Sequence, residues 1–327
     1  MIKTATIGSG VIVHSFLTAV AAVEGICCEA VYSRSREKGQ ALAAQYGVPK
    51  VYTELEEMWK DEEIAVVYVA SPNSLHYEQA KQALLHGKHV ICEKPFTPTF
   101  EQAEELVRLA KENGLFLFDA VPSSFLPHFQ KIRELLPQIG RIRLVMSNFS
   151  KYSGRYDDLL AGKVTNVFSR EFAGGCLQDI GFYNLYFNVA MFGKPQDFIY
   201  YPNIWPGEVD TSGVLILKYP DFISTNAGAK DTRGENFVQI EGEKGYLYIR
   251  DGSSRLSEIK LVTEAGEQIV KHQLSDPGLT YEVAEIVRIL REQDEEACNG
   301  RLGLMLEVIE VLEKSRKAAG IRFAGED

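Results

Sequence analysis

Positive charge and long apolar runs are both scarce in this chain of 327 residues. Its 35 Lys and Arg side chains are outnumbered by 45 Asp and Glu, which gives a net charge of −10. A deficit of positive charge argues against a nucleic acid or an anionic membrane surface as the partner. No stretch approaches the roughly 18–20 apolar residues that span a bilayer. The sequence therefore predicts a protein that binds neither nucleic acid nor membrane.

Paired cysteines are also missing. The five cysteines include no CxxC pair, and no His/Cys/Asp cluster has the spacing of metal ligands. Three of them lie in apolar runs typical of strands, so we expect buried free thiols in a reducing compartment. Residues 11–23 are apolar, but they contain His14 and follow a glycine turn, which favours a packed helix over a signal peptide. We therefore expect a cytoplasmic protein without disulfides and without a bound metal.

What the chain does contain is a regular alternation of strands and helices over residues 1–121. Such alternation requires a parallel sheet with helices on both faces. Residues 122–327 have a different character: two helices and an irregular stretch (150–175) precede six strands between 213 and 274, and two further helices follow. We predict an α/β domain over 1–121 and an α+β domain over 122–327, the second built on an open, mainly antiparallel sheet.

The segment Glu93-Lys94-Pro95 follows the apolar run 90–92. A buried parallel strand of this kind ends at the carboxyl edge of the sheet, where α/β proteins bind their ligands. Pro95 restricts the backbone of Lys94, and a peptide bond to proline can be cis. Glu93 and Lys94 are therefore candidate site residues, with a surface ion pair at a strand end as the alternative.

A glycine-rich turn, Gly8-Ser9-Gly10-Val11-Ile12, lies between the first strand and the first helix. Gly8 permits a tight turn, and Gly10 lets the backbone approach a pyrophosphate at the helix N-terminus. Val13 stands where the dinucleotide-binding pattern has Gly or Ala. A simple strand-to-helix turn is the alternative.

The second strand ends in Ser33-Arg34, with Lys38 close behind. An NAD enzyme generally has Asp or Glu here to bind the ribose 2′-hydroxyl. Hydroxyl and guanidinium groups instead suit a 2′-phosphate, so the segment predicts NADP, with NAD less favoured. Solvated basic side chains at a helix start are the alternative.

Two further segments carry polar side chains. Ser71, Asn73 and His76 follow the next buried strand, again at the carboxyl edge, although Asn73 could simply cap a helix. Asp179 and Tyr183 are four residues apart in an apolar helix and therefore share one face. A carboxylate in such a helix needs a partner, a ligand or water, and an Asp–Tyr hydrogen bond is the structural alternative.

These motifs together resemble the Gfo/Idh/MocA oxidoreductases, from Gly8-Ser-Gly10 through Glu93-Lys-Pro95 to Gly174-Gly175 and Asp179. The resemblance implies a Rossmann domain in which Lys94 is the active-site lysine, and a second domain in which Asp179 lies beside the substrate. Tyr183 and Arg170 match the branch that contains glucose–fructose oxidoreductase and dimeric dihydrodiol dehydrogenases. Two departures concern the substrate site: Ser124 stands where many members have arginine, and Cys176 replaces a third glycine.

The resulting hypothesis is NADP-dependent hydride transfer to or from a hydroxyl or carbonyl carbon of a sugar, polyol or cyclic diol. Catalysis is expected from Lys94, Tyr183 and Asp179, with Arg170 as a further substrate contact. Tyr183 would carry the proton, and Lys94 would lower its pKa from the usual value of about 10. Two other classes stay open, a non-catalytic NADP-binding regulator and a lyase or glycosidase with internal hydride return. Apolar residues on both faces of strand 214–217 predict a homodimer or homotetramer.

Overall fold

The computed structural model describes residues 1–271 and 279–326. The chain forms two compact units, and each unit consists of two segments. The first unit contains Met1–Pro122 and Ser275–Leu306, and the second contains Ser123–Leu274 and Glu307–Asp327. The chain thus passes from the first unit to the second near residue 122, and a later segment returns to the first unit.

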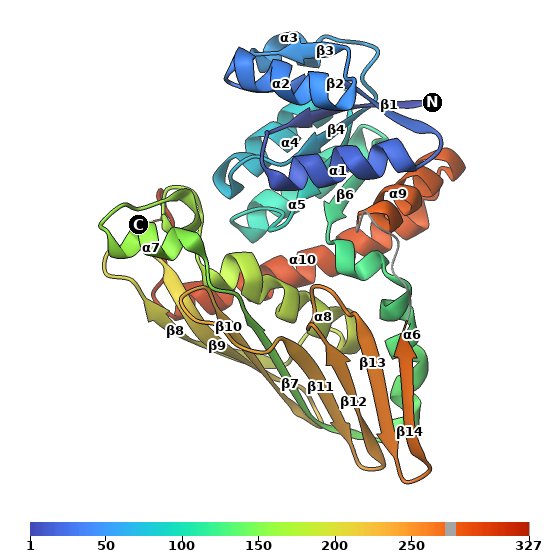
Figure 1. Cartoon of the computed structure of the whole chain (residues 1–327), viewed down its shortest axis with the longest axis vertical. Helices are drawn as coiled ribbons and strands as arrows, with labels where there is room; N and C mark the ends of the chain where they lie inside the picture. Colours follow the sequence, from blue (N-terminus) through green and yellow to red (C-terminus); the bar gives the residue numbers. More distant parts are fainter. Residues whose placement is uncertain (272–278, 327) are drawn as a thin grey trace. The chain divides into compact units, whose positions relative to one another are not determined.

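The first unit is built on a parallel sheet of six strands in the order β3-β2-β1-β4-β5-β6 (Figure 1). Its strands are β1 (Ile2–Ile7), β2 (Ile26–Tyr32), β3 (Lys50–Tyr52), β4 (Val66–Val69), β5 (His89–Glu93) and β6 (Leu117–Ala120). Its helices are α1 (Val11–Ala22), α2 (Arg36–Tyr46), α3 (Leu55–Trp59), α4 (His76–Leu85), α5 (Phe100–Glu112), α9 (Thr280–Glu292) and the start of α10 (Glu295–Ala318). This order is that of a doubly wound Rossmann sheet, so the predicted fold of the first unit is confirmed.

Local sequence explains the elements of this unit. Strand β4 reads Val-Val-Tyr-Val and is buried throughout, as expected for a strand covered on both faces. Helix α2 begins where the Ser35 side chain accepts the Lys38 amide and ends at Gly47, whose φ of 68° closes the helix. The polar and apolar alternation in α5 buries only its inner face.

The second unit is built on an eight-stranded sheet in the order β14-β13-β12-β11-β7-β10-β9-β8. Within the described residues, the pair β7–β10 is parallel and the other six pairings of this sheet are antiparallel. Its strands are β7 (Ile142–Ser150), β8 (Asp197–Ile204), β9 (Asp210–Lys218), β10 (Ile223–Ala229), β11 (Phe237–Gly242), β12 (Gly245–Arg250), β13 (Glu258–Thr263) and β14 (Gly266–Lys271). The predicted mainly antiparallel sheet is confirmed, and residues 272–274 of the last expected strand lie outside the described residues.

The helices of the second unit lie along this sheet or beside the ends of its strands (Figure 1). They are α6 (Pro127–Leu135), α7 (Gly154–Leu160) and α8 (Phe182–Phe192), with the end of α10 (Glu295–Ala318). Helix α8 packs against β7 and β10, and α6 packs against β13. No helix in the described part of the chain is long and apolar enough to cross a bilayer.

Two elements of this unit are absent from the expectation drawn from the sequence. Helix α7 lies inside the stretch expected to be irregular, where Ser153 caps it by accepting the Arg155 amide. Strand β8 contains Pro202, which a central strand would not tolerate. Because β8 forms the edge of the sheet and pairs only with β9, it is a position at which a strand accommodates proline.

Candidate functional site

The cofactor-binding candidates of the first unit follow the carboxyl ends of four neighbouring parallel strands, β2, β1, β4 and β5. Backbone hydrogen bonds tie these strand ends together: the Gly8 amide donates to the Tyr32 carbonyl at 3.4 Å, and the Ala70 amide donates to Ile7 at 2.9 Å. The strand order reverses at β1 and β4, which is where doubly wound sheets bind their ligands. The sheet therefore brings the predicted motifs to one edge.

The glycine turn is shaped to accept a phosphate. Gly8 has a φ of +120°, and a Cβ there would lie 2.5 Å from the Ala70 carbonyl oxygen, so only glycine fits. Gly10 caps α1 without a side-chain hydrogen bond, and the first turn contains no acidic residue. Ser9 and Gly10 are exposed, so the amides at this helix end are accessible to an anion. Val13, at the third position of the pattern, is fully buried under the turn.

The expected 2′-phosphate segment lies at the end of β2. Arg34 and Lys38 are exposed, whereas Ser33 is buried and its hydroxyl accepts the Ser35 amide at 3.3 Å. The exposed guanidinium of Arg34 therefore stands at the sheet edge where a ribose-binding carboxylate is usual. This part of the site has cationic donors and no acid at the end of β2.

His76 joins two of the candidate segments. Its ring is buried, with Nδ1 3.0 Å from the Pro95 carbonyl oxygen and Nε2 2.8 Å from the Ser71 carbonyl oxygen. Burial lowers the pKa of His76, an effect that the two carbonyls partly oppose. The described contacts of His76 thus hold the backbone on either side, including the cis peptide bond between Lys94 and Pro95. Asn73 does not cap α4, because a 3₁₀ turn (Asn73–Leu75) intervenes and Leu75 is the N-cap.

Glu93 is fixed from two directions beneath Lys94. The Tyr68 hydroxyl donates to Glu93 Oε1 at 2.5 Å, and the Lys94 amide donates to Oε2 at 3.2 Å. The Tyr68 ring stacks on Phe16 of α1 with centroids 3.9 Å apart. Glu93 is therefore buried and oriented, which makes it part of the support of the strand end.

A second buried acid, Glu282 on α9, was missed by the sequence argument. Its side chain is fully buried, and neither carboxyl oxygen has a hydrogen-bond partner in the described structure. Desolvation raises the pKa of Glu282 well above its usual value, and the charges of Glu93 and Asp119 raise it further. Three acids from three elements, Glu93, Asp119 and Glu282, are thus buried near one another within the first unit. A helix pattern alone could not show that the Glu282 side chain points inward.

In the second unit, Asp179 lies on a distorted turn. The segment Leu177–Gly181 is π-helical and runs into α8, so Asp179 and Tyr183 are not on one regular α-helical face as the four-residue spacing predicts. Before this turn, a Cβ at Gly174 would meet the Val167 carbonyl oxygen at 2.5 Å. Asp210 accepts the Leu177 amide at 2.6 Å and so holds the start of the turn. π-Helical turns occur frequently at functional sites.

A lysine that the sequence argument did not select contacts Asp179. Lys230 follows β10 directly, and its ammonium group forms an ion pair with Asp179 Oδ2. The Lys230 side chain is only 7% exposed, whereas that of Asp179 is 34% exposed. Lys230 follows a strand that is buried only at alternate positions, so the sequence gives no signal for this contact. Within the second unit, Lys230 is therefore the partner that the Asp179 carboxylate needs.

Tyr183 and Arg170 have different surroundings within this unit. Tyr183 is half-buried, and its ring meets that of Phe149 edge-on with centroids 5.9 Å apart. The Arg170 guanidinium donates through Nε to the Arg322 carbonyl at 2.8 Å, and the Arg170 carbonyl accepts the Ala324 amide. Arg170 thus anchors the segment after α10, and a substrate contact by this residue stays a prediction.

Both departures noted in the sequence lie in the second unit. Cys176 is fully buried, and its Sγ would lie 3.3 Å from a Cβ at Gly228, so the thiol fills space against β10. Burial raises its pKa well above the usual value, which leaves it a poor nucleophile. Ser124 lies in a short 3₁₀ turn, Pro122–Phe125. The five cysteines are free thiols, and the described residues contain no group of three metal-ligating side chains.

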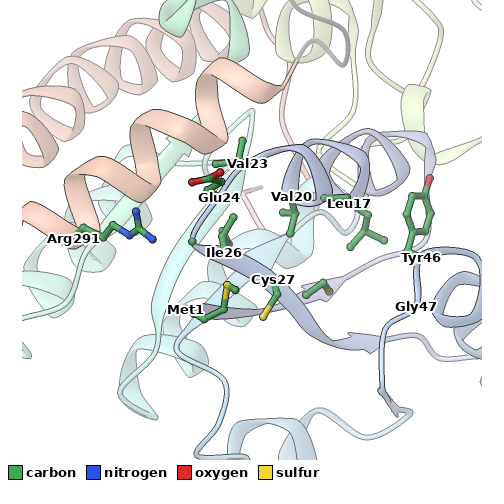
Figure 2. A pocket seen from close by; sticks show the side chains of 13 residues that line it. Met1, Leu17, Val20, Val23, Glu24, Ile26, Cys27, Tyr46, Gly47 and Arg291 are labelled. Carbon is green, nitrogen blue, oxygen red and sulfur yellow. The ribbon is translucent and has the colours of Figure 1, made fainter.

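A pocket of about 580 Å³ lies in the first unit away from these motifs (Figure 2). Apolar side chains of α1 and β2, including Leu17, Val20 and Ile26, line it, with Arg291 of α9 at one side. These residues surround the amino ends of β1 and β2, whereas Gly8 and Ser33 follow the carboxyl ends. The pocket is therefore separate from the cofactor edge.

The sequence as a whole matches proteins of known class. A family model described as "Oxidoreductase family, NAD-binding Rossmann fold" matches residues 2–120, and the "GFO/IDH/MocA C-terminal domain" matches residues 129–248. The chain is 34% identical to scyllo-inositol 2-dehydrogenase (NADP(+)) IolU of Bacillus subtilis, over 99% of this chain and 98% of that protein. It is 27% identical to trans-1,2-dihydrobenzene-1,2-diol dehydrogenase of Sus scrofa, over 90% and 89% of the two chains.

Solved structures show the same fold at lower identity. KijD10, a 3-ketoreductase from Actinomadura kijaniata in complex with NADP and TDP-benzene, superposes with a TM-score of 0.87 at 20% identity, over 98% of each chain. Fold, glycine turn and end-to-end similarity agree on one class, the NAD(P)-dependent oxidoreductases. The chain belongs to the Gfo/Idh/MocA family of that class.

Proposed function

We propose that this protein is an NADP-dependent dehydrogenase that acts on a hydroxyl group of a polyol, a sugar or a cyclic diol in the cytoplasm. The observation that supports NADP is the Ser33-Arg34 pair at the end of β2, where Arg34 is exposed and no carboxylate stands. The guanidinium group of Arg presents donors that match the oxygens of a phosphate. A carboxylate, by contrast, accepts hydrogen bonds from the hydroxyls of a ribose, which Arg cannot do. The name of IolU, which specifies NADP(+), agrees with this choice.

The residues of the first unit fit a dinucleotide. The uncapped start of α1 and the space beside Gly10 suit a pyrophosphate, and Arg34 with Lys38 suits the 2′-phosphate. NADP, when bound, supplies the hydride-accepting carbon. The predicted contacts of Ser71, Asn73, His76 and Glu93 would then shape the rest of the cofactor site.

The proton is assigned to residues of the chain. When a hydroxyl carbon loses hydride, its oxygen must also lose a proton, and we propose that the phenolate form of Tyr183 accepts this proton. Lys94 acts with Tyr183, since a cation nearby favours the phenolate form of a tyrosine. Asp179 binds and orients a substrate hydroxyl, and Arg170 is a weaker substrate contact. Tyr183 returns the proton in the reductive direction.

The substrate class is inferred from two sources. Both IolU and the dihydrodiol dehydrogenase are named for ring compounds that carry neighbouring hydroxyls. The second unit presents Asp179 at an intermediate exposure beside a lysine, an arrangement suited to hydroxyl donors. A polyol with adjacent hydroxyls is therefore the substrate that these features favour.

The purified protein should be assayed against a panel of inositols, sugars and cyclic diols with either NADP or NAD. We expect net NADPH formation with at least one member, which an internal hydride return or a pure sensor would not give. Arg34→Ala should weaken NADP binding about 10- to 100-fold, the usual worth of a charge-assisted contact, with little change for NAD. Arg36→Ala, two residues further at the start of α2, is the matched control. Tighter binding of NAD than of NADP by the wild type would refute the cofactor assignment.

A further inference from the structure

We infer that Lys230 is a positioning residue of the substrate site, because it fixes the direction in which the Asp179 carboxylate meets a substrate hydroxyl. The inference rests on the proposed function, which assigns Asp179 to the substrate. Lys230 extends from the carboxyl end of β10, and its ammonium group is bonded to Asp179 Oδ2. One strand end thus controls the orientation of a side chain on a different element.

The exposure of the two partners is unequal. The Lys230 side chain is 7% exposed and Asp179 is 34% exposed, so the base is enclosed while the acid reaches the surface of the unit. A pair that served only stability would gain little from a partly exposed acid, because water weakens such pairs. The arrangement instead favours a carboxylate that is bound by Lys230 through Oδ2 and is still partly exposed to a ligand.

The backbone of Lys230 is held by hydrogen bonds on both sides. Its amide donates to the Thr211 carbonyl at 2.9 Å, and its carbonyl accepts the Ser153 amide at 2.9 Å. Its ammonium group lies 5.9 Å from the centre of the Phe168 ring. Because its backbone is held and its side chain is 7% exposed, Lys230 has less freedom to reorient than the 34% exposed Asp179.

The neighbouring acid is engaged elsewhere. Asp231, the next residue, accepts the Thr211 hydroxyl at 2.7 Å and the Ser212 hydroxyl at 2.8 Å through Oδ2. Lys230 therefore pairs with Asp179 on the π-helical turn while Asp231 secures the start of β9. A carboxylate offers about four acceptor positions, so the bond to Lys230 selects which of them face a hydroxyl donor.

The test is steady-state kinetics of the full-length enzyme with saturating NADP and the best substrate of the panel. Lys230→Met should raise the KM for the polyol at least tenfold and lower kcat, with NADP affinity unchanged. Lys230→Arg, which keeps the charge, should restore most of the loss. Lys218→Met, which removes an exposed lysine from the end of β9, is the matched control and should behave as wild type. The Lys230→Met, Asp179→Asn double variant should be no worse than Asp179→Asn, since the pair acts as one unit.

Each outcome decides the assignment. A folded Lys230→Met with wild-type KM and kcat overturns it, and if that variant does not fold, Lys230→Gln takes its place under the same criterion. A Lys230→Arg variant as impaired as Lys230→Met also overturns it, because the charge would then not matter. A wild type that turns over no member of the panel overturns the proposed function and this assignment together. An active wild type with unaffected Lys230 variants overturns this assignment alone.

Discussion

At the scale of single residues, the candidate site side chains are held by neighbours that the sequence alone does not identify. Asp179 is bonded to Lys230, and Glu93 is bonded to the Tyr68 hydroxyl. Motifs such as Glu93-Lys94-Pro95 could be read from the chain because strand ends of a parallel sheet gather at one edge. Lys230 could not, because its partner lies 51 residues away in sequence and the contact depends on the packing of the second unit.

The first prediction concerns proton transfer. Tyr183→Phe removes the proposed proton carrier and should lower kcat about 10²- to 10⁴-fold, the usual contribution of general acid–base catalysis. NADP affinity should stay the same, because Tyr183 is assigned to the substrate. Lys94→Ala should also lower kcat, and the double variant should be little worse than the poorer single variant. Tyr246→Phe on β12 serves as the control, and near-normal turnover of Tyr183→Phe at neutral pH would contradict the assignment.

A second prediction at this scale concerns Glu282. Its pKa is raised in the folded protein, so the folded state keeps the proton while the unfolded chain loses it above about pH 4.3. Stability should therefore fall as pH rises from about 4.3 towards the raised pKa, by at most about 1.4 kcal/mol per pH unit. Glu282→Gln carries no titrating group and should gain stability over wild type as pH rises.

Urea unfolding of wild type and Glu282→Gln at about pH 5, about pH 6.5 and about pH 8 measures the difference in their free energies of unfolding. Glu56→Gln, at an exposed position of α3, is the control and should follow wild type. A constant difference between Glu282→Gln and wild type across this range would show that the Glu282 carboxyl does not hold its proton.

At the scale of elements, regular strands and helices could be predicted, and the irregular ones could not. The parallel sheet of the first unit followed from buried apolar runs between helices, and Gly47 marked the end of α2. Strand β8 was missed because Pro202 interrupts it, which only an edge position permits. The π-helical turn at Leu177–Gly181 was missed because its side-chain pattern is that of an ordinary helix. The contact at its start, in which Asp210 accepts the Leu177 amide, comes from a residue far away in the sequence.

Exposed apolar side chains near the edge of the second sheet lead to a further prediction, that the protein self-associates. Ile199 and Tyr201 of β8 lie opposite Ile216 and Val214 of β9, so the four side chains share one face. Ile199, Tyr201 and Val214 are 47%, 59% and 38% exposed. Leu215 and Leu217 of the same strand are buried on the other face. An apolar face of this kind indicates an interface, and we expect a homodimer or homotetramer.

Light scattering at micromolar concentration measures the mass of the wild type and of Tyr201→Glu. The charge should shift the wild-type oligomer towards the monomer, because an unpaired carboxylate is costly in an interface. Leu85→Glu, at an exposed position of α4 in the first unit, should leave the mass unchanged. A monomeric wild type would refute the expectation.

At the scale of the whole molecule, neither unit is a continuous piece of chain. The sequence indicates the change of character near residue 122, and it gives no sign that residues 275–306 belong with the first unit. Helix α9 packs against α1, and its buried residues include Val283, Ile286 and Leu290. Each such side chain contributes about 1.5–3 kcal/mol when it leaves water. The division into a cofactor domain over 1–121 and a substrate domain over 122–327 stays a prediction in functional terms.

A truncated chain tests the importance of this return. Residues 1–122 alone would expose the surface that α9 covers and should fail to show a cooperative thermal transition. A fragment in which residues 279–306 are joined to residue 122 by a flexible linker should recover it, because the missing contacts are restored. Calorimetry of the two fragments makes the comparison, and a cooperative transition of residues 1–122 alone would contradict the expectation.

The return of α9 to the first unit also has a consequence for synthesis on the ribosome. The sheet of this unit is complete at residue 120, but α9, which packs against α1, ends only at residue 292. At about 5–20 residues per second, roughly ten to thirty seconds separate the two events. During that interval the nascent first unit carries an uncovered apolar surface while the second unit is still being made. Chaperone demand should therefore be highest in the middle of translation, and synonymous codons that slow the ribosome between residues 122 and 280 should lower the yield of folded protein.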